Sequence, residues 1–327
     1  MVCNKEEKRD VGAELNNIHL SSGRMQAEIA PQGATLVCLS REGRDLILGI
    51  HDLADASINN FYAGAIVGPV ANRVSGGQVA IDGQSFQMEC NEAGTTSLHS
   101  GSDGLHALIW DVCEVLPDSV LLQIHLPDGY SGLPGNREIS VLYVLSNDGL
   151  AVKITANTDQ RTPINIAHHP YWALQSDQSK TKLSIVSDRY LPKTSNGLPT
   201  GQSKPVANGP FDFIKPRELG ANADLDHNWC LSEVKSENPR PVATLLASDG
   251  LQLNIATTEV GMQVYTGSAL PILKPFHCKT DQIQPNAGIA LEAQGWPDAP
   301  NQPGFPNIFV ERNETYRQIT QYTFTQN

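Results

Sequence analysis

Residues 137–158 read REISVLYVLSNDGLAVKITANT, and this stretch decides the fold. Apolar side chains occupy every second position on either side of a polar turn, namely Ile139, Val141, Tyr143, Leu145, Leu150, Val152 and Ile154. Alternation with a period of two is typical of a half-buried β-strand. The turn Asn147-Asp148-Gly149 between the two runs is typical of a hairpin. The stretch therefore predicts two antiparallel strands that share one apolar face.

The same alternation recurs along the chain. Residues 79–81 and 86–90 flank an Asp82-Gly83 turn, and further alternating runs cover residues 120–126 and 316–324. A helical stripe never persists over three turns, and 27 glycines and 21 prolines interrupt the runs. This pattern predicts an all-β sandwich or barrel rather than alternating βαβ units. Because we find no linker, repeat or charge block, we expect one β domain over residues 1–327.

Composition excludes several classes of partner. The chain has 23 basic and 35 acidic residues, a net charge of −12, which disfavours nucleic acid and anionic membranes. Its apolar runs are shorter than the roughly 18 residues that a membrane span needs. The charged N-terminus lacks the apolar core of a secretory signal, so we expect a cytoplasmic protein. Six cysteines without a CxxC pair predict reduced, mostly buried thiols.

Residues 165–174, NIAHHPYWAL, place two histidines in an apolar run. Adjacent residues of an extended chain point to opposite faces, so His168 and His169 cannot both bind one ion. The sequence also lacks HExxH zinc, GxSxG nucleophile, GxGxxG and Walker motifs. We therefore expect neither a metal nor a cofactor.

A carboxylate in the run IALEAQ, residues 289–294, suggests a different chemistry. The run resembles a buried strand, where an unpaired Glu292 carboxylate would be costly. A histidine and carboxylates without a metal or nucleophile suit general acid–base catalysis. Aromatic residues beside the polar clusters suit the apolar faces of a sugar ring or ordinary core packing; they are Tyr171, Trp172, Trp229, Tyr265 and Trp296.

The order and context of these motifs resemble the aldose 1-epimerase (galactose mutarotase) family. The matching stretches, from about residue 60 to residue 324, are GPVANRVSGG, SLHSG, GYSGLPG, NIAHHPYWAL, DLDHNW, QVYTG, LEAQGWPDAPNQPGFP and ETYRQITQYTF. The resemblance implies a large antiparallel β-sandwich, the supersandwich of galactose mutarotases. It also implies an enzyme that interconverts the α and β anomers of free aldohexoses such as galactose and glucose, without a cofactor. The expected partner is a monosaccharide, and the protein is expected to be a monomer or homodimer.

Site residues follow from the resemblance position by position. The histidine acid falls on His169 and the glutamate base on Glu292, with His168 as a structural neighbour. Sugar contacts fall on Asn72, Arg73, His99, Asp226 and Gln263, with Asp224 as a competitor of Asp226. We expect the neighbouring carboxylate to raise the pKa of His169, so that Glu292 sets the ascending limb of the pH profile and His169 the descending limb.

The chain also departs from the family pattern, and three other functions stay open. Pro69-Val70 replaces Arg-Tyr, and Ala173 replaces an Asn, which could alter the choice of aldose. One alternative is a hexose-6-phosphate 1-epimerase, which would need extra basic residues near the site. Another is a glycoside hydrolase that uses Asp226 and Glu292 as its carboxylate pair. The third is a non-catalytic sugar-binding β-sandwich.

Overall fold

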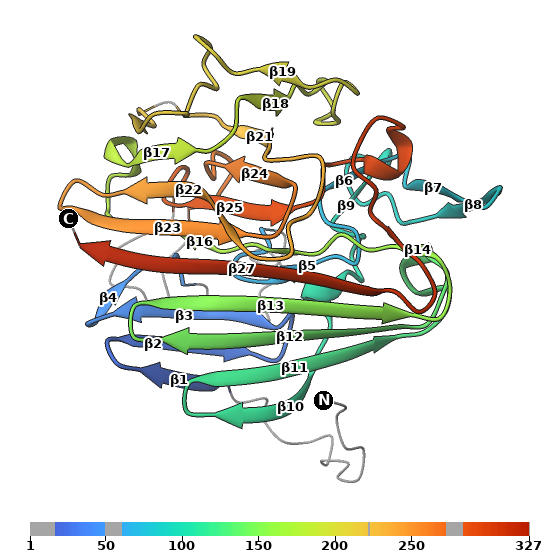
Figure 1. The fold of residues 1–327 in the computed structure, drawn as a ribbon, viewed down its shortest axis with the longest axis horizontal. Coiled ribbons are helices and arrows are strands. Elements are labelled where there is room, and N and C mark those ends of the chain that lie inside the picture. The colour runs from blue at the N-terminus through green and yellow to red at the C-terminus, as the bar shows by residue number, and fades with distance from the viewer. Residues whose placement is uncertain (1–16, 50–60, 222, 273–283, 327) are drawn as a thin grey trace.

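The computed structural model describes residues 17–49, 61–221, 223–272 and 284–326. Within them, a nine-stranded sheet forms one layer of a β-sandwich (Figure 1). Its strands, in spatial order, are β10 (Asp111–Leu116), β11 (Ser119–Leu126), β12 (Arg137–Ser146), β13 (Gly149–Thr158), β27 (Thr315–Gln326), β23 (Leu251–Thr257), β22 (Arg240–Leu246), β17 (Lys182–Ile185) and β20 (Arg217–Glu218).

Two smaller sheets pack against this layer. One is four-stranded, with β1 (Ile18–Ser22), β2 (Met25–Ala30), β3 (Thr35–Arg41) and β4 (Arg44–Asp45). The other is six-stranded, with β16 (Tyr171–Trp172), β25 (Ile289–Gln294), β24 (Gly261–Tyr265), β21 (Asp226–Cys230), β18 (Arg189–Leu191) and β19 (Lys204–Pro205). Buried apolar side chains of all three sheets belong to one core cluster.

Short paired strands and single helical turns are the other regular elements in the described residues. The pairs are β5 (Ile66–Val67) with β15 (Ala167–His168), β6 (Arg73–Ser75) with β9 (Thr96–Leu98), β7 (Gln78–Ile81) with β8 (Gln84–Gln87), and β14 (Thr162–Pro163) with β26 (Phe309–Val310). The turns are 3-10 helices at η1 (Leu105–Ala107), η2 (Tyr130–Gly132), η3 (Gln178–Lys180) and η4 (Ala299–Asn301). None of the helices in the described ranges has the length and apolar character that crossing a membrane requires.

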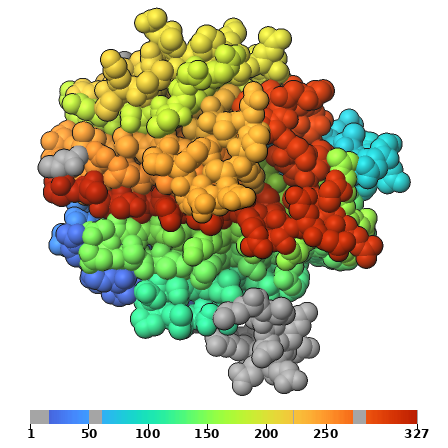
Figure 2. Space-filling view, in the orientation of Figure 1, coloured from blue at the N-terminus to red at the C-terminus, as the bar shows by residue number. Residues whose placement is uncertain are grey.

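The alternation in the sequence predicted an all-β sandwich or barrel, and the family resemblance implied the antiparallel sandwich. β12 and β13 pair antiparallel from Arg137 opposite Thr158 to Ser146 opposite Gly149. The Asp82-Gly83 turn joins the predicted hairpin of β7 and β8. The C-terminal strand β27 lies between β13 and β23, and its band crosses the middle of the sheet in Figure 2. The prediction of an all-β antiparallel sandwich is therefore confirmed.

The prediction of mostly buried thiols is wrong for the cysteines in the described ranges. Cys230 is buried, whereas Cys38, Cys90 and Cys113 are partly exposed. Cys113, for example, lies on β10, an edge strand whose side chains face solvent for the most part. Cys3 and Cys278 lie outside the described residues.

His168 belongs to the core between the layers. Only 3% of its surface is exposed, and its Nδ1 lies 3.4 Å from the Tyr322 hydroxyl of β27. The rings of Tyr143 and Tyr322 contact the imidazole edge to face, at centroid distances of 5.7 and 5.8 Å. Burial lowers the pKa of His168 to about 3. The ring is therefore a neutral structural group at neutral pH.

This depressed pKa makes a prediction about stability. Below pH 6.5 the unfolded chain binds a proton at His168 that the folded chain rejects down to pH about 3, so stability is lost as the pH falls through this range. One pH unit corresponds to about 1.4 kcal/mol, so from pH 6.5 to pH 4.5 His168 should account for a loss of about 2–3 kcal/mol. Urea unfolding should therefore show a weaker pH dependence for His168→Phe than for the wild type. His19→Phe, at an exposed position, is the control. If the free energy of unfolding changed equally with pH in the wild type, His168→Phe and His19→Phe, the prediction would be contradicted.

Candidate active site

Seven side chains singled out by the sequence motifs line one cavity of about 370 Å³. They come from β6, β21, β24, β25, and the segments that precede β6, follow β9 and join β15 to β16. The seven are Asn72, Arg73, His99, His169, Asp226, Gln263 and Glu292. The fold thus gathers all the predicted site residues into a single cavity, which falls within the usual size range of small-molecule sites.

Strand register places three of these groups side by side. Gln263 of β24 is the register partner of Glu292 on β25 and of Asn228 on β21. Residues two apart on a strand share a face, so Asp226 lies on the same side of the sheet as Asn228. Gln263 accordingly donates from Nε2 to Oδ1 of Asp226 at 2.7 Å. Three neighbouring strands therefore present polar groups to the cavity from one face of the sheet.

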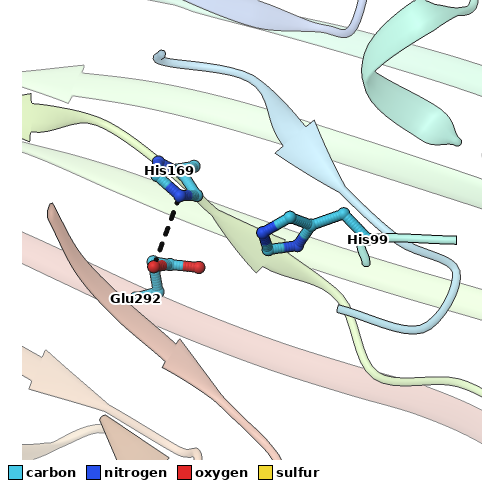
Figure 3. Close-up of side chains that lie close together, drawn as sticks. All are labelled: His99, His169 and Glu292. Atoms are coloured by element: carbon cyan, nitrogen blue, oxygen red, sulfur yellow. Dashed lines mark ion pairs between the residues drawn. The ribbon is translucent and has the colours of Figure 1, made fainter. Parts of the chain in front are cut away.

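His169 is held by its backbone at the other side of the cavity. Its amide donates to the Ala65 carbonyl at 3.0 Å, and its carbonyl accepts from the Gly64 amide at 2.9 Å. The ring faces Glu292, with Nε2 3.4 Å from Oε1 (Figure 3). The two side chains are only 5% and 2% exposed. Since His168 points into the core, the two histidines do occupy opposite faces.

Burial sets the protonation of this pair. Burial, together with nearby Asp226, raises the pKa of Glu292 to about 8, although Arg73 opposes the shift. Burial lowers the pKa of His169 to about 4. The expectation that the carboxylate would raise the pKa of His169 is therefore wrong, because desolvation disfavours both ions. Between these values the pair carries one proton, which rests on Glu292.

His99 completes a cluster in which ligand atoms of His99, His169 and Glu292 all lie within 4.8 Å of one another (Figure 3). Nδ1 of His99 accepts a hydrogen bond from the Asn72 amide at 3.1 Å. Burial holds its pKa well below the usual value, so the ring is neutral and carries its hydrogen on Nε2. A metal would need the lone pair that this hydrogen occupies. The cluster is therefore better suited to hydrogen bonds with a substrate than to metal binding.

Charged groups at the more exposed end of the cavity form a connected network. Arg73 donates to both carboxylate oxygens of Glu92, from Nε at 2.7 Å and from Nη2 at 2.8 Å. Its Nη1 lies 3.5 Å from Oδ2 of Asp226, and the same oxygen accepts from Lys193 Nζ at 2.8 Å. Burial opposes the ionisation of Asp226, but Arg73 and Lys193 hold its pKa below the usual value. Two cations and two carboxylates thus balance each other here.

The structure separates the two competing aspartates. Both line the cavity, but Asp224 accepts from the Ser268 hydroxyl at 2.8 Å, whereas Asp226 contacts Gln263, Lys193 and Arg73. Asp226 is thereby bonded to Gln263, the register partner of Glu292 on the neighbouring strand. Asp226, unlike Asp224, therefore belongs to the charged network of the cavity.

The aromatic lining differs from the predicted one. Tyr171 and Tyr265 line the cavity, together with Phe61 and Tyr62. The three tryptophans pack elsewhere: Trp172 on Tyr322 and Phe324, Trp229 on Phe211 and Phe213, and Trp296 on Phe305. Of the two alternatives left open by the sequence, ordinary packing therefore holds for Trp172, Trp229 and Trp296. Strand alternation explains the first case, because Trp172 must face away from the side that Tyr171 occupies.

Seven lining residues were missed from the sequence, namely Phe61, Tyr62, Glu92, Leu98, Lys193, Ser268 and Ala269. Tyr62 lies against the His99 and His106 rings, at centroid distances of 4.5 and 4.7 Å. Glu92 and Lys193 are charged residues in polar turns, which usually indicate a solvated surface. The sequence carries no local signal that would distinguish them from other surface charges.

The departures from the family pattern do not reach the cavity. Val70 belongs to a separate apolar cluster, and the Pro69 carbonyl accepts from the Asn165 amide at 2.8 Å. Ala173 donates from its amide to the Leu46 carbonyl at 2.9 Å. None of the three lines the cavity.

A second cavity, of about 490 Å³, lacks comparable chemistry. It lies among residues such as Ser176, Leu219 and Asn286. Among the described residues that line it, Asp177 alone carries a charged side chain. It offers no acid–base pair, so the smaller cavity is the candidate active site.

Comparisons with known proteins identify the family of the chain. The family model described as Aldose 1-epimerase matches residues 16–323. The chain is 34% identical to the galactose mutarotase of Rattus norvegicus over 96% of this chain and 95% of that protein. It is 31% identical to the aldose 1-epimerase of Escherichia coli (strain K12) over 80% of each chain.

Solved structures give the same result for the fold. A GalM/aldose epimerase homologue from C. elegans superposes with a TM-score of 0.87 at 25% identity, covering 95% of this chain and 99% of that chain. The galactose 1-epimerase of Lactobacillus acidophilus NCFM gives a TM-score of 0.82 at 25% identity, covering 98% and 97%. The chain therefore belongs to the aldose 1-epimerase family and is an isomerase of this kind.

Proposed function

We propose that the chain interconverts the α and β anomers of a free aldohexose, such as galactose or glucose, in the cavity around His169 and Glu292. The single observation that carries this proposal is the buried contact of 3.4 Å between His169 Nε2 and Glu292 Oε1. An acid and a base at this separation can serve the two oxygens on one anomeric carbon. A cytoplasmic location, a monomeric or homodimeric state and action without a cofactor belong to the same proposal.

The reaction needs two proton transfers. Glu292 takes the proton of the anomeric hydroxyl while His169 gives a proton to the ring oxygen. The bond between the anomeric carbon and the ring oxygen breaks, and a carbonyl group forms at that carbon. After rotation of the open chain, the hydroxyl attacks either face of the carbonyl, and the two residues reverse their roles. The protein is regenerated without any net gain or loss of protons.

The remaining residues hold the sugar. Asp226 and Gln263 offer an acceptor and an amide to its hydroxyl groups, and Arg73 offers a cation beside them. The neutral His99 donates from Nε2, and Asn72 fixes this tautomer through its amide. Hydrogen bonds of this kind orient the ring so that its anomeric carbon meets the acid–base pair.

The cavity gives little support to the other functions. A sugar phosphate would need unpaired cations, but Arg73 and Lys193 are each paired with a carboxylate. A purely binding module has no use for a buried acid–base pair, which is costly to maintain. Release of sugar from a glycoside would instead indicate hydrolysis by Asp226 and Glu292.

Removal of either catalytic group should slow the reaction strongly. General acid–base residues contribute about 10²–10⁴-fold each, so His169→Asn and Glu292→Gln should each lower kcat by that factor. Polarimetry of freshly dissolved α-galactose and α-glucose measures the effect. His168→Asn is the matched control, and it should lower kcat far less because its ring lies in the core. A folded His169→Asn protein with nearly full activity would refute the mechanism.

The pH profile of kcat/KM should be bell-shaped with a broad plateau. The productive form has ionised Glu292 and protonated His169, which is the same net protonation as the resting pair. Its population is therefore constant between pH about 4 and about 8. Below pH 4 Glu292 is ionised ever more rarely, and above pH 8 His169 is protonated ever more rarely. The pKa of His169 therefore sets the ascending limb and that of Glu292 the descending limb, the reverse of the order expected from the sequence. A single limb near pH 6.5 would contradict this assignment.

The two aspartates should differ on substitution. Asp226→Ala should lower kcat/KM at least ~10-fold, about 1.4 kcal/mol, because Asp226 joins the sugar-binding network. Arg73→Ala should do the same, since it removes the cation beside that carboxylate. Asp224→Ala is the control and should retain most of the activity. The reverse order of effects would assign the sugar contact to Asp224.

A further inference from the structure

Lys193 begins a short loop and lines the cavity at its more exposed end. The loop from residue 193 to residue 199 is tied by hydrogen bonds from the Thr194 amide to the Leu198 carbonyl at 2.8 Å and from the Gly197 amide to the Thr194 carbonyl at 3.0 Å. A Cβ atom on Gly197 would lie 2.7 Å from Nε of Arg73, so the loop rests directly on the guanidinium. Lys193 therefore has a defined position beside the site rather than a free place on the surface.

Exposure increases along the cavity from the catalytic pair to Lys193. The side chains of His169 and Glu292 are 5% and 2% exposed, whereas those of Asp226 and Lys193 are 22% and 30% exposed. The reacting anomeric carbon must lie at the buried end. Lys193 therefore faces the part of a bound sugar that is farthest from the chemistry, and it also lines the adjoining cavity of about 360 Å³.

The ammonium group of Lys193 has unused hydrogen-bonding capacity. It carries three donors, and among the described residues its hydrogen bond goes to Oδ2 of Asp226 at 2.8 Å. A sugar hydroxyl can donate to Asp226 and at the same time accept from a neighbouring cation. An acceptor and a donor side by side match the dual character of a hydroxyl group.

We propose that Lys193 is a substrate-binding residue of this site, whose ammonium donates to a hydroxyl oxygen at the end of the sugar remote from the anomeric carbon. This inference rests on the proposed mutarotase function. Binding energy gained at the remote end orients the reacting end, so the contact should affect KM more than kcat.

Lys193 also offsets the charge of Asp226, which acts on the catalytic base. Asp226 raises and Arg73 lowers the pKa of Glu292. Loss of the lysine charge should therefore let Asp226 raise that pKa further. The charged and titratable groups that surround Glu292 are His99, His169, Tyr171, Tyr322, Arg73 and Asp226.

The test compares Lys193→Met with Lys193→Arg. Lys193→Met keeps a long side chain without the charge and should raise KM about 10-fold, the effect of one charge-assisted hydrogen bond. It should also move the descending limb of the pH profile to higher pH. Lys193→Arg keeps the positive charge, so its descending limb should lie at the same pH as that of the wild type. Lys204→Met, an exposed lysine on β19, is the matched control and should behave as the wild type does.

Sugars that lack one hydroxyl group each identify the contact. For one of these deoxy sugars, the KM of the wild type should rise by the same factor of about 10. The KM of Lys193→Met should not rise further with that sugar, because the contact is already absent. Unchanged KM and pH profile in Lys193→Met would overturn the proposal. A rise in the KM of Lys193→Met that persists, relative to the wild type, with every deoxy sugar would overturn it as well. Wild-type protein without mutarotation would instead refute the proposed function, before any variant is compared.

Discussion

A carboxyl group in the middle of a completely buried strand constrains the rest of the site. All six residues of β25 are buried, and the side chain of Glu292 is 2% exposed. Removing an ion from water costs several kcal/mol even after the protein relaxes, so the fold must supply a proton or a partner. It supplies both, because Glu292 keeps its proton up to pH about 8 and lies 3.4 Å from His169. A proton donor and a proton acceptor thereby remain next to each other, and both side chains are almost completely buried.

The position of His169 depends on a single step along the backbone. His168 and His169 are adjacent, yet the first contacts Tyr322 in the core and the second faces Glu292. The pairing of β15 with β5 and the backbone hydrogen bonds of His169 with residues 64 and 65 fix this orientation. A shift of one residue would exchange the two rings and bring the core histidine into the cavity. The sandwich and the active site therefore depend on the same register.

Much of the fold could be predicted from the sequence, because strands with one buried face record that face in every second residue. The alternation around Tyr143 and the Asp82-Gly83 turn are of this kind. His169 and Glu292 also stand out, as costly polar groups in apolar runs, but their roles and the sugar contacts were assigned from the resemblance to the aldose 1-epimerase family. Charged residues in polar turns do not interrupt an apolar run, and for this reason Glu92 and Lys193 were missed. The tryptophans show the opposite error, because neighbouring a polar residue in sequence does not decide which face a side chain occupies.

The site combines two kinds of electrostatic environment, and their order along the cavity has a chemical reason. Proton transfer benefits from a dry and neutral end, where the strengths of acid and base are set by burial rather than by solvent. Recognition of hydroxyl groups benefits from charged donors and acceptors, which make stronger hydrogen bonds than neutral ones. Such charges are stable only where they are partly hydrated and mutually paired, as Arg73, Glu92, Asp226 and Lys193 are. If the charged network lay at the buried end, its electric field would hold the proton of the catalytic pair on one partner. The neutral pair must therefore lie at the buried end and the charged network at the exposed end.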